Sequence, residues 1–170
     1  MHSRGFAPIA APDARVLVLG SLPGQVSLRR REYYAQPRNA FWPIMGALFG
    51  AGPELAYPLR AARLRRHGVA VWDVCHSAFR AGSLDAAIVA GSVTVNDFAH
   101  FYARHGSLRV VCFNGRAAET LYRRRVLPGL TGAAARLTLL ALPSTSPAHA
   151  TRPFAEKLAA WRLLARAAGR

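Results

Sequence analysis

The apolar positions of the chain fall into short continuous runs separated by longer stretches with helical spacing. Four runs are apolar almost throughout, as in strands that are buried on both faces of a parallel sheet. They cover residues 15–20, 68–74, 108–113 and 137–142. Because helical stretches alternate with these runs, the pattern predicts a parallel sheet between layers of helices, which is an α/β fold.

The helical stretches differ in how clearly they are marked. Apolar residues recur every three or four positions over residues 39–49, and Pro43 falls in the first turn, where proline is tolerated. Further helices are expected over residues 54–67, over residues 96–105 and between the third and fourth strands. The last helix is predicted to follow Thr151 as its N-cap. Its buried face is expected to carry Phe154, Leu158, Trp161 and Ala165.

Two stretches lack a clear pattern. Residues 1–14 are rich in proline and alanine and are predicted to be loosely ordered, and residues 75–93 are expected to be irregular around a turn at 82–85. Nothing marks a repeat or a linker, so residues 1–170 are expected to form a single domain. The sequence has no apolar run of about 18 residues and no apolar core of a secretory signal, which favours a cytoplasmic protein without a membrane span.

The charge of the chain is strongly unbalanced. There are 23 lysines and arginines against 8 acidic residues, which gives a formal net charge of +15. A compact domain with this charge favours a polyanionic partner, with nucleic acid ahead of an anionic membrane surface or an acidic protein. The two cysteines, Cys75 and Cys112, are too few for a four-cysteine metal site.

Several common active sites are absent from the sequence. There is no G-x-G-x-x-G, no Walker loop and no G-x-S-x-G elbow, and the acidic residues and histidines are scattered, so no metal site is expected. Open α/β sheets bind ligands at the carboxyl ends of their strands. The polar residues expected there are Ser21, Tyr34, Asn39, Asp73, Asn114, Ser144, Ser146 and His149. This set suits the recognition of a planar polar ring and the activation of water.

Four motifs together carry a resemblance. They read GSLPG at 20–24, YAQPRNAFWP at 34–43, GVAVWDV at 68–74 and LPSTSPAH at 142–149. In this order they resemble the uracil-DNA glycosylase superfamily, and most closely its hypoxanthine-DNA (deoxyinosine) glycosylase family. The resemblance implies a three-layer α/β/α sandwich with a four-stranded parallel sheet, base flipping, and hydrolysis of an N-glycosidic bond without a metal or other cofactor.

The resemblance also implies roles for single residues. Asn39 matches the hydrolytic asparagine of the hypoxanthine family, and Ser21 stands where the uracil enzymes carry an Asp or Asn that positions water. Tyr34 falls where an aromatic ring stacks on the flipped base, and Asp73 ends the strand that carries base recognition in relatives. The remaining base-binding candidates are Gly20, Leu22, Pro23, Gly24 and Asn114.

The loop after the fourth strand is implied to enter the minor groove beside the flipped nucleotide. Its expected DNA contacts are Ser144, Thr145, Ser146, Pro147, Ala148 and His149. Arg38 and Arg152 are candidates for phosphate contacts. Ser144 stands where many uracil enzymes have a histidine, and Ala148 stands where several have a leucine wedge.

Three of these assignments have plainer alternatives. Asn39 precedes an apolar helical run, where asparagine is a common N-cap, and Asn114 with Gly115 is typical of a strand-to-helix turn. Asp73 can simply cap a turn after its strand. However, deamination replaces a ring acceptor with an N–H donor beside a new carbonyl, and a carboxylate only accepts hydrogen bonds. We therefore expect Asp73 to read that N–H group.

The predicted function is that of a monofunctional DNA glycosylase of base excision repair, which removes hypoxanthine or uracil and leaves an abasic site. Its expected partner is DNA that contains deaminated bases, and it is expected to act as a monomer without an obligate protein partner or a membrane. The alternatives are a uracil-specific DNA glycosylase, a non-catalytic DNA-binding protein on the same fold, and a small-molecule hydrolase or nucleotide-binding enzyme.

Overall fold

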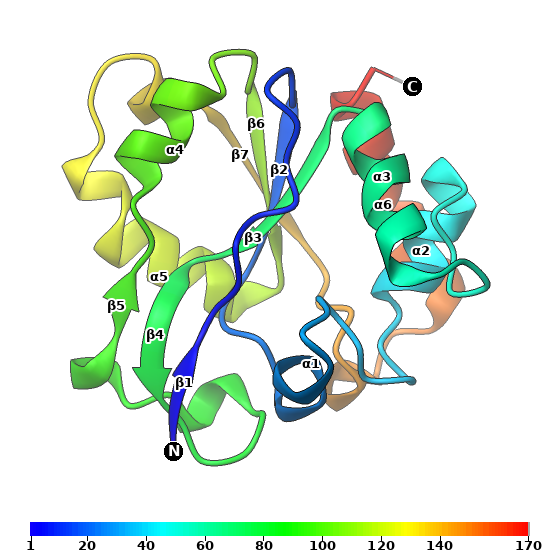
Figure 1. The fold of residues 1–170 in the computed structure, drawn as a ribbon, viewed down its shortest axis with the longest axis horizontal. Helices are drawn as coiled ribbons and strands as arrows, with labels where there is room; N and C mark the ends of the chain where they lie inside the picture. Colours follow the sequence, from blue (N-terminus) through cyan, green and yellow to red (C-terminus); the bar gives the residue numbers. More distant parts are fainter. Residues whose placement is uncertain (170) are drawn as a thin grey trace.

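The computed structural model describes residues 1–169, and at its centre four parallel strands form a sheet in the order β3-β2-β6-β7 (Figure 1). The strands are β2 (Val16–Gly20), β3 (Val69–Asp73), β6 (Val110–Asn114) and β7 (Thr138–Leu142). Every residue of β2 and β3 is buried, because these strands have neighbours on both faces. The predicted parallel sheet is confirmed.

Helices cover both faces of this sheet. One face carries α2 (Phe41–Phe49), α3 (Tyr57–Arg66) and α6 (Phe154–Ala167), and the other carries α4 (Phe98–Arg104) and α5 (Arg116–Arg125) (Figure 1). On the first face the Phe41 and Trp161 rings meet edge to face with their centroids 6.0 Å apart. On the second, the Phe113 and Tyr122 rings lie 5.2 Å apart. The three-layer α/β/α sandwich is therefore confirmed.

Short helical segments fill the loops. The helix α1 (Gln25–Arg30) directly follows the GSLPG sequence. Single 3₁₀ turns are η1 (Asp85–Ala87), η2 (Ala90–Ser92), η3 (Leu127–Gly129), η4 (Ala134–Arg136) and η5 (Pro147–His149). Across residues 1–169, no helix combines the length and the apolar character needed to cross a membrane.

Residues 1–14 are not loosely ordered, contrary to prediction. β1 (His2–Arg4) pairs antiparallel with β4 (Cys75–Phe79), whose other edge pairs with β5 (Thr94–Val95), so the described chain contains a second, three-stranded sheet. Ile9 adds a bridge to Val71 at the edge of the main sheet. The expectation that residues 75–93 are irregular is wrong for β4. β4 has no apolar run, because buried and exposed positions are mixed along it. Its partner β1 is also distant in the sequence, so no hairpin signal marks the pair.

The last helix begins later than predicted. Thr151 is not its N-cap, because α6 follows Pro153, which has an extended backbone and no side-chain hydrogen bond. A residue before proline is disfavoured from the helical conformation, so Arg152 cannot join the helix. Phe154, expected on the buried face, is 46% exposed. The buried residues of α6 are Lys157, Trp161 and Leu164.

Candidate active site

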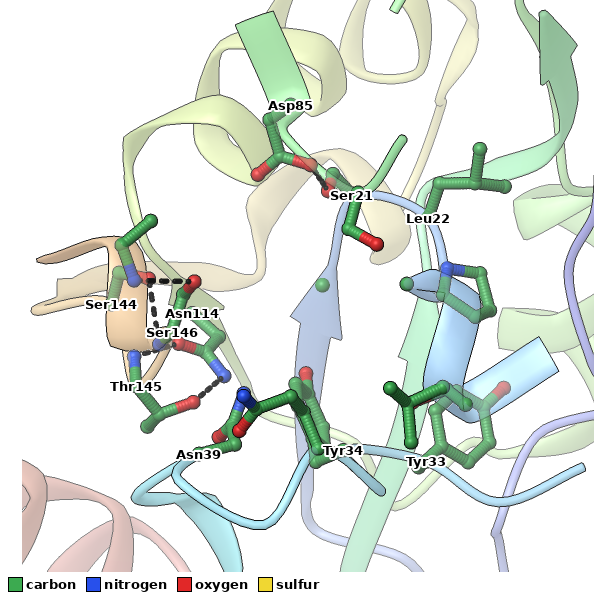
Figure 2. A pocket seen from close by; sticks show the side chains of 18 of the residues that line it. Ser21, Leu22, Tyr33, Tyr34, Asn39, Asp85, Asn114, Ser144, Thr145 and Ser146 are labelled. Atoms are coloured by element: carbon green, nitrogen blue, oxygen red, sulfur yellow. Dashed lines mark hydrogen bonds between the residues drawn. The ribbon is translucent and has the colours of Figure 1, made fainter. Parts of the chain in front are cut away.

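The carboxyl ends of the parallel strands border a cavity of about 330 Å³, within the range of small-ligand sites (Figure 2). Most of the predicted site residues line it: Gly20, Ser21, Leu22, Pro23, Gly24, Tyr34, Asn39, Asp73, Asn114, Ser144, Thr145, Ser146, Pro147 and Ala148. Residues that are far apart in the sequence thus meet in one hollow. In Figure 2 the Ser21–Asp85 pair lies at the top of the view, and Tyr34 and Asn39 lie at the bottom.

The floor of the cavity depends on the absence of a side chain at Gly20. This residue ends β2 and is in register with Asp73 on β3. A Cβ atom at Gly20 would lie 2.5 Å from Asp73 Oδ1 and 3.0 Å from the hydroxyl oxygen of Tyr34. Glycine is therefore required here so that a carboxylate and a phenol can approach the main chain at the end of the central strand.

Asp73 is an acid that is buried without a full set of partners. Its side chain is 3% exposed, and its Oδ2 atom has no hydrogen-bond partner among the described residues. The pKa of Asp73 is raised to about 7, mainly by burial and secondly by the nearby Asp85, and Arg80 partly opposes this rise. A buried polar atom that lacks a protein partner on a cavity wall is suited to hydrogen-bond a ligand.

Tyr34 is held in an unusual backbone conformation. Its φ of 54° is in the left-handed region, which non-glycine residues rarely adopt and in which strained residues cluster at active sites and ligand clamps. Its ring stacks on the Phe41 ring with the centroids 4.0 Å apart and the planes 24° apart. The hydroxyl group is buried without a hydrogen-bond partner in residues 1–169, and burial raises its pKa. One face of the ring is thus supported by the core beside the cavity.

Asn39 takes part in starting a helix as well as lining the cavity. Its Oδ1 accepts a hydrogen bond of 2.9 Å from the backbone N–H of Phe41, the first residue of α2. The capping alternative is therefore correct for this oxygen, although the N-cap position itself is Ala40. A carbonyl oxygen has a second lone pair, and the Asn39 Nδ2 donates to no acceptor among the described residues. Both groups remain usable by a ligand or water.

Asn114 has a structural role at the cavity wall. Its Nδ2 donates to Thr145 Oγ1 and its Oδ1 accepts from the Thr145 backbone N–H, each at 2.9 Å. Gly115 has a φ of +92°, and a Cβ atom there would lie 2.9 Å from the Cβ of Ser144. These contacts favour the turn alternative for Asn114, since two of the four hydrogen bonds that its side chain can make hold the loop at Thr145.

Two charged residues of the site were not among the predicted residues. Ser21 Oγ donates to Asp85, which lines the cavity (Figure 2). Arg80 is 1% exposed, and its guanidinium donates to the carbonyl of Leu22 at 3.1 Å and to that of Pro23. Its Nη1 atom lies 3.8 Å from Asp85 Oδ1. A buried arginine therefore supports the GSLPG loop from behind, and no sequence signal separates it from the many surface arginines.

The sequence profile of the uracil DNA glycosylase superfamily matches residues 7–165. The chain belongs to this superfamily. It is 35% identical over 147 residues to a protein named hypoxanthine DNA glycosylase from Methanosarcina acetivorans, a match that covers 81% of this chain and 92% of that protein. A protein of the same name from Methanosarcina barkeri is 34% identical over 117 residues, which is 68% of this chain and 73% of that protein.

The fold of this superfamily member is also similar to a solved structure. A solution NMR structure of a Methanosarcina acetivorans protein, provisionally assigned as a uracil DNA glycosylase, superimposes with a TM-score of 0.82 at 30% identity and covers 100% of both chains. The GSLPG sequence of this superfamily member forms the cavity wall between the end of β2 and the start of α1. Its last motif is the wall formed after β7.

Three residues predicted to contact DNA lie outside the cavity lining of this superfamily member. Arg38, His149 and Arg152 are all exposed. Among the residues that line the cavity, only Asp73 and Asp85 have side chains that can carry a full charge at neutral pH. Across residues 1–169 no group of three or more His, Cys, Asp or Glu side chains is placed to hold a metal ion.

Proposed function

We propose that this superfamily member is a monofunctional DNA glycosylase that hydrolyses the N-glycosidic bond of a flipped, deaminated base. It acts as a monomer, prefers hypoxanthine to uracil, and leaves an abasic site. One observation carries the proposal: an aromatic ring, an unpartnered carboxylate oxygen and an amide converge on one cavity at Tyr34, Asp73 and Asn39. The preference for hypoxanthine is supported by the names of the two archaeal relatives.

Asp73 selects the base in this proposal. Hypoxanthine carries an N–H group beside its carbonyl, and the ionised Asp73 accepts from that group while backbone N–H groups near Ser21 and Leu22 donate to the carbonyl. Adenine presents a lone pair at the same position, so a carboxylate would leave two acceptors facing each other. An unmatched buried pair of this kind costs about 1–3 kcal/mol.

Asn39 holds the attacking water. Cleavage of the N-glycosidic bond develops positive charge on the sugar, so the reaction needs a placed water more than a strong base. The water oxygen bonds to C1′, the base leaves with the electron pair of the broken bond, and a water proton neutralises the leaving base. Ser21 assists on the other wall, where its hydroxyl is oriented by Asp85.

DNA approaches the mouth of the cavity in this proposal. The net charge of +15 supports binding to a polyanion, and in this proposal the exposed Arg38 and Arg152 contact phosphates. The loop at 144–148 faces the groove of the duplex, and Tyr34 stacks on the extruded base. Base–aromatic stacking contributes about 1–3 kcal/mol for each base.

The test uses end-labelled duplexes that contain inosine, uracil or only normal bases, incubated with a metal chelator and then treated with alkali. We expect strand cleavage at inosine only after alkali, with weaker cleavage at uracil and none in the normal duplex. Cleavage without alkali would contradict a monofunctional enzyme. Salt-dependent binding with no alkali-labile site would identify a non-catalytic DNA-binding protein instead.

A further inference from the structure

One large apolar side chain stands exposed at the mouth of the cavity. Leu84 is 60% exposed and lines the cavity. The other large apolar side chains that are exposed within residues 1–169 lie away from its lining: Met1, Leu59, Phe79, Val89, Phe154 and Leu163. An exposed leucine is common on protein surfaces, so exposure alone does not indicate a function. The hydrogen bonds that fix the backbone on either side of Leu84 are the second observation.

Both neighbours of Leu84 are attached to the GSLPG wall of the site. Ser83 Oγ accepts a 2.9 Å hydrogen bond from the backbone N–H of Gln25 at the start of α1. On the other side, Asp85 accepts from Ser21 Oγ and faces the buried Arg80 at 3.8 Å. Leu84 is thus fixed in place by two polar anchors, while its own side chain remains in solvent.

The loop at 144–148 on the opposite wall carries no large apolar side chain that is exposed. The loop at 144–148 contributes Ser144, Thr145, Ser146, Pro147 and Ala148, and Thr145 is buried against Asn114. Proteins that bind in the minor groove frequently insert an apolar side chain between base steps, and leucine is one of the residues used. Leu84 is the side chain of the cavity lining that matches this requirement in size, exposure and anchoring.

We propose that Leu84 is the wedge that enters the base stack as the target nucleotide swings into the cavity. This proposal rests on the proposed function, because it requires a flipped base. The side chain then leaves solvent and packs between the two bases that flank the space left by the extruded base. In this position it prevents the extruded nucleotide from returning. The wedge is therefore supplied by the loop between β4 and η1, and not by the loop after β7.

The test compares Leu84→Ala with the wild type under single-turnover conditions on three substrates that contain inosine. These are an ordinary duplex, a single strand, and a duplex with a bulky pyrene nucleotide opposite the inosine, which forces the base out. We expect Leu84→Ala to slow excision about tenfold or more on the ordinary duplex and less than about twofold on the other two. Leu84→Met should keep most of the wild-type excision rate on the ordinary duplex. Leu59→Ala is the control, since Leu59 is 56% exposed on α3 away from the cavity.

Equal loss on all three substrates would overturn the wedge and place Leu84 in contact with the base itself. An unchanged rate on the ordinary duplex would also overturn it. A second readout does not depend on excision: 2-aminopurine beside the target position should brighten on binding of the wild type but not of Leu84→Ala. If the wild type releases no base, the proposed function fails, and the 2-aminopurine signal still decides the wedge.

Discussion

Gly20 and Asp73 occupy one register position at the ends of β2 and β3, and the Asp73 carboxylate fills the space that a side chain on Gly20 would need. The two residues together create a strand end where the main chain and an acid lie within reach of one small ligand. Three helices, α1 to α3, separate these residues in the sequence, and the parallel pairing of β2 with β3 brings them together.

Gly20→Ala is expected to abolish base excision while the protein remains folded. The added Cβ would meet Asp73 Oδ1 at 2.5 Å and push the carboxylate out of place. Overpacking of this kind costs about 1–3 kcal/mol of stability. Single-turnover excision and thermal melting would measure the two effects. Gly91→Ala is the matched control, because a Cβ there meets nothing within 4 Å, and equal activity of the two variants would contradict the expectation.

Asp73→Asn is expected to reduce discrimination between inosine and adenosine about tenfold to a hundredfold, because an amide can donate to the lone pair of adenine.

Discrimination between inosine and adenosine by the wild type should depend on pH. The pKa of Asp73 is raised to about 7, so below this pH the protonated acid can donate to adenine, and above it the carboxylate rejects adenine. Excision rates on both duplexes, measured from about pH 6 to about pH 8, should show a ratio that rises with pH in the wild type and stays flat in the variant.

The same residue is expected to set a pH dependence of stability. The folded-state pKa of Asp73 is about 7 against an ordinary value of 3.8, so the fold favours the protonated acid. This contribution is fully present below about pH 4 and is lost as the pH rises through about 7. Asp73→Asn should therefore gain stability relative to the wild type between these values, by about 2–4 kcal/mol. Urea unfolding of both proteins at several pH values measures the gain, and parallel profiles would refute it.

Two substitutions of Asn39 are expected to have different effects on stability and the same effect on the excision rate. Asn39→Ala removes the acceptor for the Phe41 N–H and should cost about 1 kcal/mol of stability. It should also slow excision about a hundredfold or more, because the water loses its positioning group. Asn39→Ser supplies another capping oxygen, so unfolding measurements should show recovered stability while the excision rate stays low. A folded Asn39→Ala protein with the wild-type rate would remove Asn39 from the chemistry.

Arg80 is expected to stabilise the protein far more than an exposed arginine with a shorter ion pair. Arg80→Met leaves the carbonyls of Leu22 and Pro23 without their buried donor, which should cost about 1–3 kcal/mol for each carbonyl. Arg123 lies 2.9 Å from Glu119 on the surface of α5, and Arg123→Ala should cost about 0.5 kcal/mol or less. Denaturant unfolding of both variants tests the difference, and similar losses would contradict it.

The main sheet and most of the site lining could be predicted because both leave local signals. A parallel strand that is buried on both faces must be apolar throughout, as at Val16–Gly20 and Val69–Asp73. Ligand-binding residues in such a fold follow the strand ends, and this rule alone indicates Ser21, Asp73 and Asn114, all of which line the cavity.

The remaining features depend on distant partners that no local pattern reveals. β1 is ordered only because β4 offers an open edge, and β4 alternates too irregularly to be recognised as a strand. Arg80 resembles the other arginines in sequence, and its burial follows from the carbonyls of Leu22 and Pro23 that meet it. Phe154 has the helical spacing of a buried residue, yet it is exposed as the first residue of α6, contrary to prediction.

The central claim is that a water molecule displaces a deaminated base within this cavity. Incubation of an inosine duplex with excess protein in the presence of sodium borohydride, followed by mass spectrometry of all products, tests it most directly. We expect free hypoxanthine in equal amount to an uncleaved strand with one abasic sugar, and no covalent protein–DNA adduct, because water and not a protein amine replaces the base. Bound duplex with no free base, or a borohydride-trapped adduct, would contradict the claim.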